Sequence, residues 1–107
     1  MIAYLKGTLI DKSEKYLLIL AGPVGYKTWV TTDLAAKYPL KKDLELFIYT
    51  AVKEDDIRLY GFESKEALDF FESLLGVSGI GPKMALDVLN HPIAITQQAI
   101  LNQDIAF

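Results

Sequence analysis

A glycine-rich segment between two apolar-periodic stretches constrains the fold of this sequence more than any other feature. It covers residues 75–85 and reads Leu-Gly-Val-Ser-Gly-Ile-Gly-Pro-Lys-Met-Ala. Gly79 and Gly81 can adopt backbone angles that other residues avoid, and they leave their N–H groups uncovered. Pro82 suits the first position of a following helix, where its missing N–H is no loss. The pattern predicts a helix-hairpin-helix.

The predicted loop has the properties of a phosphate site. The amides and the positive dipole end at the start of a helix attract anions, and Lys83 adds a cation there. The same residues also suit a plain turn between packed helices, since Gly and Pro are common in turns. The helical flanks and the lysine favour the phosphate interpretation. The predicted contacts to a nucleic-acid backbone are Gly79, Ile80, Gly81, Pro82 and Lys83.

Composition limits the classes of protein to consider. The chain has 107 residues, of which 51% are hydrophobic, enough for one medium domain or two very small ones. Its formal net charge of −3 argues against a surface that coats nucleic acid, so any DNA contact should be local. Cysteine is absent, which excludes disulfides and thiolate metal sites. Without a signal peptide or a run long enough to span a bilayer, we expect a cytoplasmic protein with no membrane partner.

The first part of the sequence is strand-like. Short runs of β-branched, aromatic and aliphatic residues predict five strands, at 2–10, 16–20, 26–31, 44–49 and 57–60. Turn signals separate them. A short helix is predicted over 34–38, capped at Thr32 or Asp33 and stopped by Pro39. Five strands with a helix after the third fit a small barrel of the OB type.

The hydrophobic period changes after Phe62. Ser64 is a plausible N-cap for an amphipathic helix, and a second helix runs from Pro82 to about Asn90. His91 and Pro92 end that helix, and residues 96–102 carry a third helical pattern. The predicted class is β + α, an OB-type barrel over 1–62 followed by a helical domain over 63–107 with one helix-hairpin-helix. Residues 102–107 begin a helix without a stop signal, so we expect a truncated piece.

Catalytic and metal sites are not indicated. Glu54, Asp55 and Asp56 form an acidic bend that could be solvated or could bind Mg²⁺, yet consecutive strand residues alternate in direction and do not converge on one ion. His91 is the only histidine and has no second nitrogen or sulfur ligand in the sequence. Nucleophilic catalysis lacks a histidine-based constellation. We therefore expect no catalytic residue, no metal and no cofactor.

The predicted barrel contains further candidates for DNA contact. Its aromatic residues could stack on single-stranded bases, but their apolar strand positions favour core or subunit contacts. They are Tyr4, Tyr16, Tyr26, Trp29, Phe47, Tyr49 and Tyr60. The basic residues that could line a DNA face are Lys6, Lys12, Lys27, Lys53 and Arg58.

Several segments, in order along the chain, resemble the bacterial RuvA family of Holliday junction branch-migration proteins. They lie at 1–7, 24–26, 54–55, 59–62 and 79–86, and include Tyr-Gly-Phe at the end of the barrel and Gly-Ile-Gly-Pro-Lys in the hairpin. The resemblance implies a homotetramer, or an octamer, that holds four-way junction DNA flat during recombination and repair. It also implies that Glu54 and Asp55 form an acidic pin at the junction centre, where carboxylates repel phosphates.

The resemblance further implies a non-catalytic subunit. In the family a RuvB ATPase motor uses the ATP and a RuvC resolvase joins the assembly, and this sequence stops before the family's second hairpin and motor-contacting domain. The residues alone leave one alternative open. In that alternative the chain is a protein-interaction or oligomerisation scaffold, and the hairpin is only structural.

Overall fold

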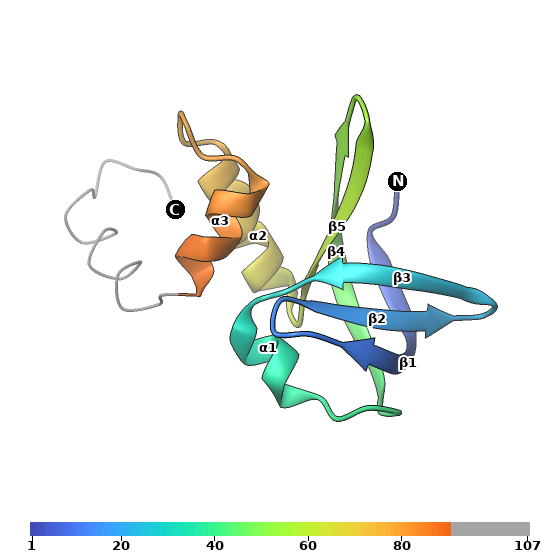
Figure 1. Cartoon of the computed structure of the whole chain (residues 1–107). Helices are drawn as coiled ribbons and strands as arrows, with labels where there is room; N and C mark the ends of the chain where they lie inside the picture. Colours follow the sequence, from blue (N-terminus) through green and yellow to red (C-terminus); the bar gives the residue numbers. More distant parts are fainter. Residues whose placement is uncertain (91–107) are drawn as a thin grey trace.

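Within residues 1–90, a barrel of five strands carries three helices in this computed structural model (Figure 1). The structure describes residues 1–90, so the helix predicted at 96–102, the break at His91 and Pro92, and the pattern at 102–107 lie outside the described residues. The strands are β1 (Tyr4–Lys12), β2 (Tyr16–Ala21), β3 (Val24–Trp29), β4 (Asp43–Lys53) and β5 (Asp56–Phe62). The helices are α1 (Thr32–Lys37), α2 (Lys65–Leu75) and α3 (Pro82–Leu89).

The strands close in the order β1-β2-β3-β5-β4. All neighbours are antiparallel except β3 and β5, which are parallel and place Trp29 beside Tyr60. The first helix follows the third strand, as predicted, and the OB-type barrel is confirmed. None of the helices in the described part of the chain is long and apolar enough to cross a membrane.

The barrel interior is filled by alternate strand residues. Leu9, Leu17, Ile19 and Leu46 have no exposed surface, as expected for the inward face of strands with a period of two. All four lie within runs that are predicted from the sequence to form strands. A β-bulge between Leu9 and Asp11 shifts the register of β1 against β2, which helps a short sheet curve into a barrel.

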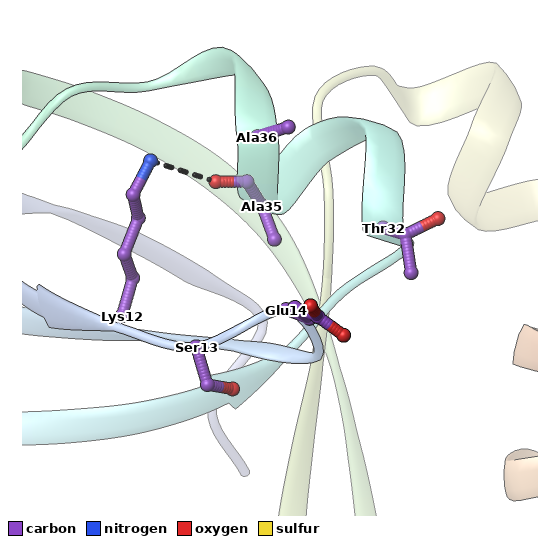
Figure 2. A pocket seen from close by; sticks show the side chains of 6 residues that line it. All are labelled: Lys12, Ser13, Glu14, Thr32, Ala35 and Ala36. Carbon is purple, nitrogen blue, oxygen red and sulfur yellow. Dashed lines mark hydrogen bonds between the residues drawn. The ribbon is translucent and has the colours of Figure 1, made fainter.

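Lys12 binds α1 to the barrel. Its ammonium donates to the carbonyl oxygen of Ala35 (3.1 Å; Figure 2) and to that of Tyr38 (2.6 Å), at the end of that helix. A cation there complements the negative end of the helix dipole and satisfies carbonyls left without helical partners. Lys12 is one of the five basic residues that could line a DNA face, and its ammonium is engaged with the end of α1.

A second hydrophobic cluster joins the helices to the barrel. Phe71 of α2 is fully buried, and its ring centroid lies 5.4 Å from Tyr49, 5.5 Å from Tyr60 and 4.8 Å from Phe62. Such tilted and edge-on ring pairs add to the gain from burial. This cluster places α2 against β4 and β5. The division at residues 62 and 63 stays a prediction.

The helix caps show how far local sequence fixes the element boundaries. The Ser64 hydroxyl accepts a hydrogen bond from the Ala67 amide (3.1 Å), as predicted for the N-cap of α2. The predicted cap of α1, Thr32 or Asp33, is one or two residues too late, because Thr31 accepts from the Leu34 amide and is the cap. Thr31 and Thr32 both carry a hydroxyl that can cap a helix, so residue type alone does not identify the cap. The position at which β3 ends determines which of the two is the cap.

Two strand glycines give a matched test of barrel packing. A Cβ at Gly7 would lie 2.3 Å from the Leu20 carbonyl oxygen, whereas a Cβ at Gly25 would meet only Leu18 at 3.5 Å. Gly7→Ala should lower the free energy of unfolding by about 1–3 kcal/mol through overpacking. Gly25→Ala should change it by less than about 0.5 kcal/mol. Urea denaturation followed by circular dichroism measures both, and equal stability of the two variants would contradict this packing.

Candidate nucleic-acid interface

The loop between α2 and α3 is compact and ordered by its own backbone. The amides of Gly76 and Val77 still donate to carbonyls in the last turn of α2. The Ile80 amide donates to the Val77 carbonyl (3.1 Å), which closes a tight turn before α3 begins at Pro82. The predicted helix-hairpin-helix geometry, two helices joined by a short turn, is present in the described residues.

The two loop glycines have different roles. Gly79 has φ +85°, in the region that favours glycine. Gly81 has φ −94° and ψ 178°, extended angles that other residues also adopt, so it does not use the conformational freedom of glycine. Gly81 is instead the N-cap of α3, and no side chain there bonds to the first turn. A Cβ at either position would enter open space, which leaves both amides accessible from solvent.

Unpaired donors gather at the start of α3. Within the described part of the chain, the amides of Gly79 and Gly81 donate to no protein acceptor. Pro82 occupies the first helical position and Lys83 follows with an exposed side chain. Because the helix dipole adds positive potential at the same end, this arrangement suits a phosphate oxygen.

The base of the hairpin is anchored in the second cluster. Ala85 is fully buried and Leu86 is 8% exposed, while Ile80 packs against the same cluster from the loop. The Ala85 amide donates to the Gly81 carbonyl (2.9 Å), which fixes the first turn of α3. The unpaired amides therefore sit on a rigid support, as a preorganised anion site requires.

Glu54 and Asp55 form the tip of the β4–β5 hairpin. Lys53 and Asp56 are paired across the strands, so the two acids make the turn itself. Both side chains are exposed, and neither carboxylate has a hydrogen-bond or ion-pair partner among the described residues. In Figure 1 this tip and the α2–α3 loop both project toward the top of the molecule. No three acidic or histidine side chains of residues 1–90 gather as metal ligands.

The barrel aromatics are engaged in packing. Tyr4 contacts the Phe47 ring and donates a hydrogen bond to the Glu45 carboxylate. Tyr16 meets Trp29 edge-on, with centroids 5.6 Å apart. Tyr60 is buried and Tyr49 is half-buried against Phe71, and together these contacts favour packing roles over a base-stacking platform.

Known protein sequences are similar to this chain. A family model described as the RuvA N terminal domain matches residues 1–61. The chain belongs to the RuvA family. Relatives named "Holliday junction branch migration complex subunit RuvA" include those of Halothermothrix orenii, 47% identical over 84% of this chain, and Syntrophotalea carbinolica, 41% identical over 94%. The RuvA of Halalkalibacterium halodurans is 43% identical over 100% of the chain.

The chain spans about half the length of these curated RuvA relatives: 46%, 51% and 53% of the three proteins. The family model covers the barrel, and the pairwise similarities continue into the helical part. The roles of Gly79 to Lys83 and of Glu54 and Asp55 stay predictions that this geometry supports.

The loop glycines give a test of the backbone argument that is independent of DNA. Gly79→Ala should lower the free energy of unfolding by about 1–2 kcal/mol, because an L-residue is strained at positive φ. Gly81→Ala should change it by less than about 0.5 kcal/mol, since a weaker cap offsets a less flexible unfolded chain. Thermal and urea unfolding of both variants measure the difference, and a reversed order would contradict the assigned angles.

Proposed function

We propose that this RuvA chain binds four-way junction DNA by its backbone, as the non-catalytic, DNA-binding part of a branch migration complex. The names of its relatives and their identity over most of the chain support the assignment. The observation that carries it is the cluster of unpaired amides at Gly79 and Gly81 beside Lys83. Such a site holds phosphates without reading bases, as recognition by DNA shape requires.

In the proposed mechanism the acidic tip discriminates between DNA structures. The β4–β5 turn, which carries Glu54 and Asp55, points toward the same end of the molecule as the α2–α3 loop (Figure 1). Carboxylates at that place repel an uninterrupted duplex, and at a junction centre they oppose reassociation of the separated strands. The loop supplies affinity and the tip supplies selectivity.

The proposed assembly is a homotetramer, or an octamer, around the junction. One hairpin per chain is a weak site, and four-fold repetition makes it strong and selective for shape. A RuvB-like ATPase supplies the motor and a RuvC-like resolvase joins the same complex, so this chain binds no ATP of its own. We place the complex in the cytoplasm, where recombination intermediates are processed.

Reversing the charge of Lys83 distinguishes a phosphate-binding hairpin from the scaffold alternative, in which the hairpin is only structural. Lys83→Glu should weaken binding to an immobile four-way junction and reduce the slope of log K against log salt by about 0.9, the loss of one phosphate contact. Fluorescence anisotropy at several salt concentrations measures both quantities. Lys42→Glu makes the same change in the α1–β4 connection, at the opposite end of the barrel in Figure 1, and is the control. Equal slopes for the two variants would favour the scaffold.

The acidic tip is tested by neutralisation. The double variant Glu54→Gln/Asp55→Asn should tighten duplex binding several-fold and reduce the preference for the junction, because the repulsive charge is removed. Glu14→Gln/Glu72→Gln removes the same charge from exposed positions elsewhere. Competition between junction and duplex of equal length measures the preference. An unchanged preference in the tip variant would exclude the discriminating role.

A further inference from the structure

A cleft lies between α3 and the barrel, next to the hairpin, and shares Lys83 with the predicted site. Its volume is about 290 Å³, and its walls come from β3, β5, the β1–β2 turn, the start of α1 and the side of α3 that faces the barrel. Among the described residues that line it, Lys15, Arg58 and Lys83 are cationic and Asp87 is the one carboxylate. The cleft is therefore positively charged although the chain has a net charge of −3, and such a local concentration of positive charge suits an anion.

Arg58 is held in place by stacking. Its guanidinium lies 4.5 Å from the centroid of the Trp29 ring, and its Nε is 3.8 Å from a carboxylate oxygen of Asp56. Lys27 also lies over Trp29, 5.1 Å from the centroid. A guanidinium stacked on a ring keeps its N–H groups in the plane of its fork, where they can meet a phosphate. The stacked cations engage Trp29, which argues against a nucleobase on that ring.

The cleft is fixed at its other end. The Thr32 amide donates to the side-chain oxygen of Asn90 (2.9 Å), which ties the end of α3 to the start of α1. Lys83, Asp87 and Asn90 lie on one side of α3 because they are spaced three or four residues apart. Burial raises the pKa of Tyr60, with Arg58 opposing, so its phenol adds no negative charge to the cleft at neutral pH.

We propose that this α3–barrel cleft binds a phosphate of the DNA backbone through Arg58 and Lys15, and so extends the strand path from the α2–α3 loop onto the barrel. Lys83 belongs to both sites and makes them continuous. The proposal rests on the proposed function of the hairpin and adds a second contact on the same strand. Under this proposal the barrel face contributes part of the free energy of DNA binding, which the hairpin would otherwise supply alone.

The location is tested with the single tryptophan. Trp29 is the only tryptophan of the chain and lines the cleft, so its emission reports occupancy there. A short DNA duplex at saturating concentration should shift or quench this emission, and inorganic phosphate should do so only at far higher concentration. Saturation seen by anisotropy with unchanged Trp29 emission would overturn the proposal. An equal response to free phosphate and to DNA would identify a small-anion site and would also overturn it.

The contribution of the cleft to DNA binding is tested with two variants, one that removes a positive charge and one that removes a negative charge. Arg58→Gln should weaken duplex and junction binding several-fold and lower the salt slope by about 0.9, one phosphate contact. Asp87→Asn should tighten binding several-fold, a gain that loss of folding cannot produce. Lys42→Gln and Glu72→Gln make the same charge changes at exposed positions outside the cleft. If Arg58→Gln and Asp87→Asn change binding no more than these controls do, the proposed phosphate site in the cleft is overturned.

The outcome also separates the cleft from the function on which it rests. If wild-type protein prefers the junction and Lys83→Glu weakens it, while Arg58→Gln and Asp87→Asn match their controls, only the cleft fails. If no junction preference exists, yet duplex binding responds to Arg58→Gln and Asp87→Asn as expected, the junction function fails and the phosphate cleft stands.

Discussion

The packing of Phe71 against three barrel rings determines the relative positions of the two elements proposed to meet DNA. Tyr49, Tyr60 and Phe62 belong to β4 and β5, whose far end carries the acidic turn, and Phe71 belongs to α2, which leads into the hairpin. The loop and the acidic tip therefore have no need of direct contact to keep a fixed separation. A rigid aromatic cluster sets that separation because its rings have few alternative packings.

Charge is distributed so that attraction and repulsion act at different places. The chain has a net negative charge, yet Lys15, Arg58 and Lys83 line one cleft. Glu54 and Asp55 lie apart from them, at the tip of the β4–β5 hairpin. For a ligand as highly charged as DNA, orientation depends on such local fields more than on net charge. In the proposed function, the net negative charge weakens non-specific binding to DNA, so that DNA shape becomes the basis of selection.

Much of this arrangement is readable from the sequence, because it depends on local patterns. Strand runs, the Ser64 cap and the Pro82 helix start are short-range features, and each is confirmed in the structure. Local patterns say less where tertiary contacts decide. The contacts of Lys12 depend on two carbonyls more than twenty residues away, and the sequence does not show that Gly79 has a positive φ while Gly81 does not.

The α3–barrel cleft shows why a site of this kind escapes sequence reasoning. Lys15, Arg58 and Lys83 come from a turn, a strand and a helix, and barrel closure together with the Phe71 cluster brings them to one cavity. Arg58 and Trp29 meet only because β5 runs parallel to β3, the one parallel pair in the sheet. Parallel pairing needs a long crossover, here through α1 and β4, so no spacing rule relates these two residues. The hairpin motif can be recognised from consecutive letters, whereas the surface that would continue it exists only after the barrel has closed.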